Sequence, residues 1–425
     1  MAVSGGRDSV ALWHATARAA RDSALEVVAL HVHHGLQPQA GNWVAQLQGQ
    51  ARRWRAGGLP VRVCWQRLRG APGRGDSIEA WARRERYAAL AAMARDEGLG
   101  IVLLAHHRRD QAETFLLQAL RGGGAAGLAA MPRAAERDGI VWSRPWLDQP
   151  RSAIEAYVQR HRLRYIDDPS NTDHSLSRNR LRHEVWPALS GAFEQAESSL
   201  AASARRSQEA AACLRELAQI DASALCSVDG RLQLAGWLEL SAPRRANLLR
   251  AWLSAQAPAG VPESLVQRLL RELPVAPSAS AWPWPEGELR LHAAHLQIVP
   301  RRAAAGAAPP RLVIDLSREG RVAVPAWCGS FEVTAVDAAG VEALRLRCCE
   351  LRTRCGGERF QRASGTPPRA LKKQFQAAGV PAWQRDGPLL YGAQQLLFVP
   401  GLGIDARAHA PRGAPMLGLR WLPDR

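Results

Sequence analysis

Short apolar runs alternate with longer amphipathic runs over the first 187 residues of the chain. The apolar runs have the length of buried strands and lie at residues 25–34, 61–65 and 100–105. The longer runs have helical spacing and end at glycines, and they lie at residues 40–58, 77–98 and 110–124. Asp76 with Glu79 resembles a capping box at the start of the second of these helices. The alternation predicts an α/β domain, a Rossmann-like parallel sheet covered by helices on both faces.

The pattern changes after about residue 188. Residues 188–218 are predicted to be helical, and further helices are expected at residues 243–255 and 262–273. Residues 274–288 contain several prolines and serines and are predicted to form a loop. Residues 301–311 are rich in Ala, Pro and Gly and are typical of an interdomain linker.

The last part of the chain mixes strand-like and helical runs. Strands are expected at residues 311–316 and 330–336, and a helix is expected at residues 368–379. We therefore predict a helical middle domain followed by a small α+β domain. The three domains are expected at residues 1–189, 190–302 and 311–425.

The stretch SGGRDS directly follows the first apolar residues and precedes a helical run. Strand, glycine turn and helix together direct backbone N–H groups at a phosphate, although an ordinary tight turn has the same composition. No GK[ST] follows the glycines, so the common P-loop is excluded. A carboxylate beside phosphates favours Mg²⁺ between them, and hence ATP whose pyrophosphate leaves during adenylation. The expected phosphate-binding residues are Ser4, Gly5, Gly6, Arg7, Asp8 and Ser9.

Two further polar motifs, HVHHG and AHHRRD, also follow predicted strands. Ligands of parallel sheets bind at the carboxyl ends of the strands, so all three motifs are expected on one rim. Strand geometry places His31 and His33 on one face and His34 on the other, which argues against a shared metal ion and favours a pocket lining for adenine or substrate. His106 and His107 leave the same alternatives open.

The net charge of +17 and the isoelectric point near 10.9 favour a polyanion as partner, nucleic acid before a membrane surface. Of the 56 basic residues, only Lys372 and Lys373 are lysines. The 7 cysteines form no CxxC pair, so a disulfide framework and a zinc or iron–sulfur site are disfavoured and a reducing cytosol is expected. No membrane span and no leader are expected.

Several motifs together resemble a known family. SGGRDS is similar to the PP-loop of the N-type ATP pyrophosphatases. Combined with HVHHGL, EAWARRERY, AHHRRDQAET, RGGGAAGLAAM, DPSN and SRNRLRHEVWPAL, it resembles the tRNA(Ile)-lysidine synthase family through about residue 189. A weaker resemblance to that family's C-terminal tRNA-binding domain follows in CGGERF and LKKQFQAAGVPAWQRDGPLL.

The resemblance implies a defined reaction. ATP would activate the 2-oxygen of the wobble cytidine in the CAU anticodon of tRNA(Ile), with release of pyrophosphate. The ε-amine of free L-lysine would then displace AMP, which gives lysidine and changes decoding from AUG to AUA. Residues Ser4–Ser9 would bind the phosphates, and Asp8 would hold Mg²⁺ or aid the attack. Arg83 would face the developing charge or the substrate, unless it is a helix-surface arginine. Asp110 would take the proton of the lysine ammonium, although an N-cap role competes.

The resemblance also bears on the basic residues. Arg178, Arg180 and Arg182 would close over the anticodon loop, with a solvated basic loop as the alternative. Lys372 and Lys373 would bracket a tRNA phosphate ridge, with chance as the alternative. The family usually reads HHxDDQ, and Arg109 stands at the first Asp, so no role is expected from a first carboxylate.

Two rival functions remain at this point. Another PP-loop adenylating enzyme, such as a tRNA thiolase, would usually have CxxC pairs, which are absent here. A non-catalytic tRNA-binding protein would not need the intact Asp8 and Asp110. The sequence leaves the oligomeric state open, with a homodimer as one alternative. Arg121 and the glycines after it are consistent with a plain helix C-cap.

Overall fold

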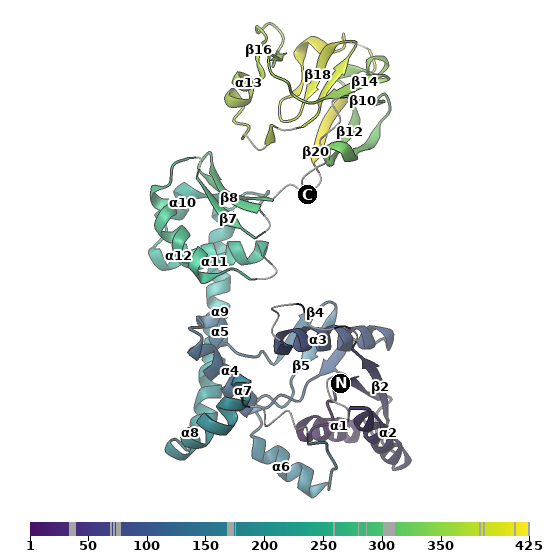
Figure 1. Cartoon of the computed structure of the whole chain (residues 1–425), viewed down its shortest axis with the longest axis vertical. Helices are drawn as coiled ribbons and strands as arrows, with labels where there is room; N and C mark the ends of the chain where they lie inside the picture. The colour runs from purple at the N-terminus through teal and green to yellow at the C-terminus, as the bar shows by residue number, and fades with distance from the viewer. Residues whose placement is uncertain are drawn as a thin grey trace. The chain divides into compact units, whose positions relative to one another are not determined.

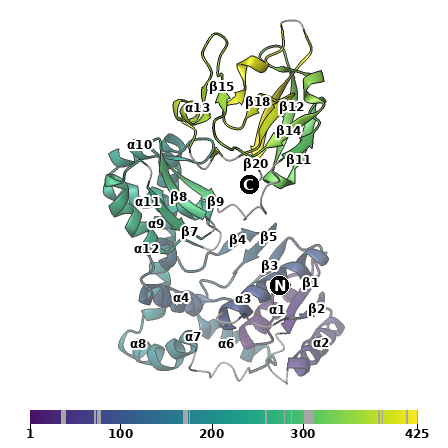
Figure 2. The same ribbon diagram turned by 45° about the horizontal axis from the view of Figure 1, so that its top comes forward.

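The computed structural model divides into two compact units, Met1–Glu216 and Leu217–Arg425, which are drawn in Figure 1 and Figure 2. The structure describes residues 1–33, 40–68, 70, 73, 78–167, 174, 176–257, 260–278, 280–285, 287–300, 311–381, 384–385, 387–411 and 414–423. Several sequence predictions lie wholly or partly outside the described residues, among them those at His34, Asp76, DPSN (168–171) and the linker (301–311).

The strands of the first unit confirm the predicted parallel sheet. The β1–β2 and β3–β5 pairs are parallel, whereas β4 adds an antiparallel edge. Residues 1–3 join the two halves, because Ala2 bridges Leu30 in parallel and donates its N–H to the carbonyl of Leu103. The strands are β1 (Val27–His33), β2 (Val61–Arg67), β3 (Ile101–Leu103), β4 (Ala134–Arg137) and β5 (Ile140–Ser143).

Helices cover both faces of this sheet. Val27 and Ala29 of β1 pack in a core with α1, α2 and α6, whereas Val28 and Leu30 pack in a second core with α3. The period of two in β1 therefore sends alternate side chains to opposite helical layers, as predicted for a doubly covered sheet. The helices of the first unit, of which α1, α2, α3 and α6 pack on the sheet, are α1 (Arg7–Ala19), α2 (Ala40–Ala56), α3 (Ile78–Asp96), α4 (Arg108–Leu120), α5 (Ala125–Leu128), α6 (Arg151–Arg160), α7 (Ser177–Arg180), the π-helical η2 (Leu181–Val185) and α8 (Trp186–Ala192). Helix α9 (Ala196–Leu225) begins in the first unit and ends in the second.

The glycines after α4 form the predicted C-cap. Gly122 has a φ of +74°, a conformation that glycine adopts without steric cost. The N–H of Gly123 reaches the carbonyl of Gln118 at 2.8 Å, and that of Gly122 reaches the carbonyl of Ala119 at 3.0 Å. These two bonds are the Schellman pattern, which ends the helix and satisfies its last carbonyls.

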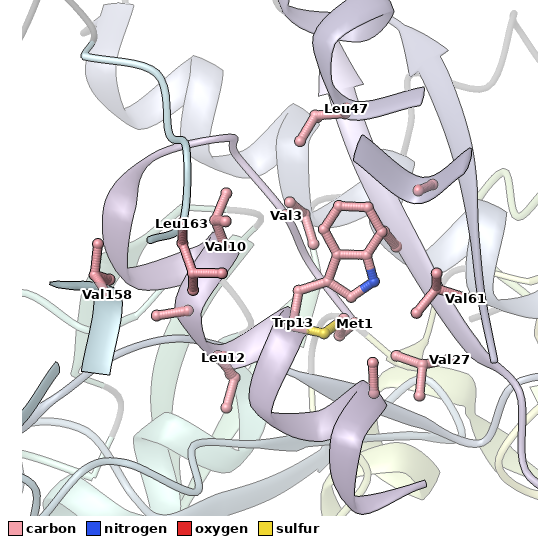
Figure 3. Packing of buried hydrophobic residues seen from close by; sticks show 14 of the residues in the cluster. Met1, Val3, Val10, Leu12, Trp13, Val27, Leu47, Val61, Val158 and Leu163 are labelled. Atoms are coloured by element: carbon pink, nitrogen blue, oxygen red, sulfur yellow. The ribbon is translucent and has the colours of Figure 1, made fainter. Parts of the chain in front are cut away.

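Helix α1 is anchored by a buried tryptophan (Figure 3). Trp13 is fully buried and makes an edge contact with Trp54 at a centroid distance of 4.7 Å. Around it lie Val27 and Val61 from neighbouring strands and Leu47 from α2. This packing fixes α1 on the sheet, and it therefore fixes the loop from which α1 starts.

The second unit begins with the helical middle region, which also contains a four-stranded antiparallel sheet in the order β6–β9–β8–β7. The loop prediction for residues 274–288 is wrong at Ala281–Trp284, which forms β7. Trp282 and Trp284 both point into the core, and Ala281 and Pro283, which alternate with them, are exposed. Pro283 is tolerated because β7 is an edge strand. The elements are β6 (Leu232–Gln233), α10 (Leu234–Glu239), α11 (Ala242–Gln256), α12 (Glu263–Glu272), η3 (Leu273–Val275), β7 (Ala281–Trp284), β8 (Gly287–His292) and β9 (His295–Pro300).

The C-terminal region is rich in strands, with a five-stranded sheet in the order β10–β14–β17–β18–β19 and a four-stranded sheet in the order β11–β12–β20–β13. Phe331 and Phe398 are buried between these sheets. The elements are β10 (Arg311–Ile314), β11 (Gly320–Val324), η4 (Pro325–Trp327), β12 (Gly329–Val336), β13 (Val341–Glu342), η5 (Ala343–Leu346), β14 (Cys349–Arg352), β15 (Arg359–Phe360), β16 (Arg369–Ala370), α13 (Leu371–Ala377), β17 (Leu389–Gly392), β18 (Gln395–Val399), β19 (Gly403–Ile404), η7 (Ala406–Ala408) and β20 (Met416–Pro423).

Two sequence expectations concern the whole chain. All seven cysteines are free in the structure. Within the described part of the chain, no helix combines the length and apolar character needed to cross a membrane.

Candidate active site

The loop Ser4–Gly6 turns directly from the first strand residues into α1. The first backbone hydrogen bond of this helix runs from Val10 to the carbonyl of Gly6 at 3.0 Å, and Gly6 offers no side-chain cap. The N–H groups before Val10 have no acceptor within the helix, as at every helix start. Together with the positive end of the helix dipole, they form a site suited to an anion such as a phosphate.

Hydroxyl groups and one glycine hold the loop in this shape. The Ser4 and Ser9 hydroxyls lie 3.1 Å apart, and the Ser9 hydroxyl donates to the carbonyl of Gly6 at 2.9 Å. Gly5 has a φ of +95°, and a Cβ at this position would lie 2.5 Å from Cδ1 of Ile166. The positive φ therefore favours glycine at position 5, and a larger residue would also displace the end of the Ile166 side chain.

Asp8 lies in the first turn of α1. Its Oδ1 pairs with Nε of Arg7 at 3.2 Å, and its Oδ2 lies 3.7 Å from Nε2 of His107. Burial alone would raise the pKa of this carboxyl, but its interactions with His107 and then Arg7 lower the pKa to about 2. Asp8 is therefore a carboxylate at neutral pH.

Asp110 is the third residue of α4 and is largely buried. Its Oδ2 accepts the backbone N–H of His107 at 3.0 Å, so the N-cap of α4 is His107, and Asp110 is the third residue of a capping box and not the N-cap that the sequence offered as its alternative role. The same oxygen lies 3.5 Å from Nε2 of His107, and Oδ1 pairs with Nη2 of Arg182 at 2.8 Å. Burial raises the pKa of Asp110, but its interactions with His107 and then with the guanidinium groups of Arg178 and Arg182 outweigh burial and leave the pKa lowered.

Arg178 and Arg182 are bound to carboxylates of α4. Glu113 has a fully buried side chain and pairs with Nε of Arg182 at 2.8 Å and with Nε of Arg178 at 3.1 Å. Arg178 also donates to the carbonyl of Asp110 at 3.2 Å and to the Thr114 hydroxyl at 3.1 Å. These two guanidinium groups neutralise the buried carboxylates and hold Asp110 in place.

The histidines of the rim lie close to the loop. Nδ1 of His31 donates to the carbonyl of Val3 at 2.8 Å, directly before the loop begins. Burial lowers the pKa of His31, and it lowers the pKa of His106 to about 3, so both rings are neutral at pH 7. Among the described residues, Nε2 of His31, Nδ1 of His106 and Nδ1 of His107 are buried polar atoms without a hydrogen-bond partner.

The two carboxylates lie near the same histidine nitrogen. Oδ2 of Asp8 and Oδ2 of Asp110 both lie within 4 Å of Nε2 of His107. Within the described ranges, no group of three or more His, Cys, Asp or Glu residues is arranged as a protein metal centre. Two carboxylates that leave the other positions to phosphates and water are the ligand set typical of Mg²⁺.

The remaining predicted residues lie outside this cluster. Arg83 is exposed on α3, with its guanidinium carbon 5.2 Å from the ring centroid of Tyr87, and its charge contributes to the low pKa of His106. Arg180 is exposed, and the contact that it makes among the described residues is with the Ser177 hydroxyl of its own helix, at 3.5 Å. Lys372 and Lys373 are exposed on α13.

Sequence reasoning missed His107 as the residue between the carboxylates and Glu113 as the partner of the arginines. Glu113 was recognisable, because it lies three residues after Asp110 and therefore on the same face of the predicted helix. No such signal marked His107, because the adjacent residue His106 is also a histidine. The two differ in that His107 is the residue directly before α4, and the sequence does not fix where that helix begins.

Family models match three segments of the chain. A PP-loop domain matches residues 1–189, a TilS substrate binding domain matches residues 232–297, and a TilS substrate C-terminal domain matches residues 349–421. The first match contains the loop, Asp8 and Asp110, and the third contains Lys372 and Lys373.

Relatives align over almost the whole chain. The chain is 41% identical over 437 residues to the tRNA(Ile)-lysidine synthase of Ralstonia nicotianae, which covers 100% of this chain and 92% of the relative. It is 39% identical over 430 residues to the tRNA(Ile)-lysidine synthase of Chromobacterium violaceum, which covers 99% of this chain and 94% of the relative. Among solved structures, the U34-tRNA thiolase NcsA from Methanococcus maripaludis is 13% identical with a TM-score of 0.41, covering 48% of this chain and 70% of that chain.

Proposed function

The chain belongs to the tRNA(Ile)-lysidine synthase family, and we propose on this premise that Asp8 and Asp110 form the catalytic centre of lysidine formation on tRNA(Ile). The enzyme is a ligase that forms a carbon–nitrogen bond with ATP. The observation that carries the proposal is that both carboxylates converge on Nε2 of His107 beside the start of α1.

The loop Ser4–Ser9 would hold the pyrophosphate part of ATP. Its N–H groups at the start of α1 supply hydrogen-bond donors at one point, and the Ser4 and Ser9 hydroxyls hold the loop in shape. Arg7, which pairs with Asp8 and Glu155, lies in the same turn. Asp8 and Asp110 would hold Mg²⁺, which supplies positive charge to the phosphates when it is bound. Loss of pyrophosphate leaves AMP on the 2-oxygen of the wobble cytidine.

Asp110 would then serve the attack by free L-lysine. Its lowered pKa keeps it anionic, so it attracts the lysine ε-ammonium, but the same ion pairs make it a weak base. It would accept the proton as the amine attacks the cytidine carbon and AMP departs. Arg83, exposed near His106, would face the charge that develops on the phosphate.

The RNA contacts are assigned to exposed basic residues. Arg180, Lys372 and Lys373 have side chains available to phosphates. For Arg178 and Arg182, the ion pairs with Asp110 and Glu113 favour a positioning role over RNA contact.

The cell compartment and the number of copies are also part of the proposal. Seven free cysteines favour the reducing cytosol, where ATP, lysine and tRNA are present. Asp8 and Asp110 come from one chain, so the proposed chemistry needs no second copy.

The test is to incubate the enzyme with ATP, Mg²⁺, labelled lysine and transcripts of tRNA(Ile) or tRNA(Met), and to analyse the nucleosides by mass spectrometry. Lysidine in tRNA(Ile) alone is expected. A thiolated nucleoside formed with a sulfur donor would support the rival PP-loop thiolase instead.

The carboxylates are tested by Asp8→Asn and Asp110→Asn. Each substitution removes the charge but keeps the shape, so each is expected to lower turnover by at least about a hundredfold with the fold intact. Asp138→Asn is a matched control, because Asp138 is exposed in a turn of the same unit and its ion pair among the described residues is with Arg137, away from the site. Near-normal lysine transfer in both active-site variants would overturn the assignment.

A further inference from the structure

Two adjacent arginines open the helix that carries Asp110. Arg108 and Arg109 are the first two residues of α4, and Asp110 is the third. The start of a helix carries partial positive charge, so cations are unfavourable in the first turn. This turn therefore needs a compensating anion besides Asp110.

Glu197 provides that anion from α9. Its Oε1 accepts a hydrogen bond from Nε of Arg108 at 3.0 Å, and its Oε2 accepts one from Nε of Arg109 at 3.2 Å. The Glu197 side chain is only 16% exposed, so solvent screens these pairs weakly. Glu197 lies in the first turn of α9, where its own negative charge is favourable.

Two further contacts hold the same turn. The guanidinium carbon of Arg109 lies 5.0 Å from the ring centroid of Trp186, which is itself buried. The backbone N–H of Arg108 donates to the carbonyl of Gln149 at 3.0 Å. We use the name α4 clamp for Arg108, Arg109, Trp186 and Glu197.

We propose that Glu197 is a positioning residue for Asp110. The α4 clamp fixes the first turn of α4, and this turn sets where the Asp110 carboxylate meets His107 and Arg182. Arg109 stands where the family pattern has an aspartate, and in this chain it serves the clamp instead of the chemistry. The inference rests on the proposed function of Asp110.

The test compares Glu197→Gln with Glu194→Gln. Glu194 lies three residues earlier, is exposed, and has no ion pair among the described residues. Glu197→Gln is expected to lower kcat by about tenfold, the order of coupling seen between neighbouring charged groups, with the KM for ATP nearly unchanged. Glu194→Gln is expected to behave like the unsubstituted enzyme.

A double-mutant cycle tests whether the effect passes through the clamp. Arg109→Gln combined with Glu197→Gln is expected to cost less than the sum of the two single losses, because both changes break the Arg109–Glu197 pair. Should Glu197→Gln not fold, Arg109→Gln and Glu197→Asp provide the same comparison. Additive losses, or a KM for ATP that rises as much as kcat falls, would overturn the positioning role.

The outcomes separate this inference from the function of Asp110. If Asp110→Asn keeps its activity, the proposed function fails and the clamp has no catalytic group to position. If Asp110→Asn is inactive while Glu197→Gln matches Glu194→Gln, the clamp alone fails.

Discussion

Two sets of basic residues in this chain have opposite surroundings. Arg178 and Arg182 in the first unit are bound to buried carboxylates, whereas Lys372 and Lys373 in the second unit are exposed on a short helix. Both sets looked alike in the sequence, as basic residues in segments that resemble tRNA-binding regions. The comparison shows that a high net charge does not identify which basic side chains bind RNA, because some of them form ion pairs with carboxylates distant in the sequence.

The largest expected effect comes from breaking the buried set. Arg182→Ala would leave Asp110 and Glu113 with one guanidinium instead of two. We expect turnover to fall at least about a hundredfold, and the free energy of unfolding to fall by about 2 kcal/mol because buried carboxylates lose a partner. Urea unfolding and the labelled-lysine assay measure the two effects.

The neighbouring Arg180 is the matched control for stability. It is exposed, and within the described part of the chain it contacts a hydroxyl of its own helix. Arg180→Ala is expected to leave the free energy of unfolding within about 0.5 kcal/mol of the original value. If Arg180→Ala and Arg182→Ala weaken tRNA binding equally and leave stability unchanged, the distinction between the two sets is wrong.

A smaller effect is expected from the exposed set. Lys372→Ala with Lys373→Ala should weaken tRNA binding and lower the salt slope by about one to two units, at roughly 0.7–0.9 per lost phosphate contact. Stability and ATP binding should not change, because neither side chain is buried. Filter binding over a range of salt concentrations measures the slope.

Replacement of both lysines by arginine sharpens this test. The double arginine variant keeps the charge but presents planar groups instead of compact ones. Binding restored by arginine would show that charge alone matters at these positions. An unchanged tRNA affinity and salt slope in the double alanine variant would mean that neither lysine contacts tRNA.

Local signals in the sequence were sufficient for much of the fold. The alternation of apolar and amphipathic runs predicted the parallel sheet and its helices, and the glycines after Arg121 predicted the C-cap at Gly122. The loop prediction failed at β7, because Pro283 outweighed the alternation of Trp282 and Trp284. A strand at the edge of a sheet needs hydrogen bonds on only one side. Whether a strand lies at the edge depends on the strand order of the whole sheet, so the sequence of the strand itself does not predict it.

The candidate site was predictable to the extent that its residues follow strands. Asp8 and Asp110 were placed on one rim by that rule, and both reach His107. The partners of Arg178 and Arg182 were not predictable, because the pairs join residues 65 and 72 positions apart. Such contacts depend on how α7 and η2 pack on α4, and the spacing of apolar residues along the sequence does not predict this packing.

The smallest expected effect concerns acid. The pKa of Asp8 is lowered from its ordinary value of 3.8 to about 2, so the folded state favours its ionised form. This contribution to stability is complete above the unfolded-state pKa and is lost as the pH falls from about 4 to about 2. Because Asp8 is one-third exposed, the effect should stay below about 1 kcal/mol. Urea unfolding should therefore show that the original protein loses stability relative to Asp8→Asn as the pH falls across this range. A difference independent of pH would mean that the ionised form of Asp8 gains nothing from His107 and Arg7. The acid response would then not distinguish the carboxylate-bound cations of the first unit from the exposed lysines of the second.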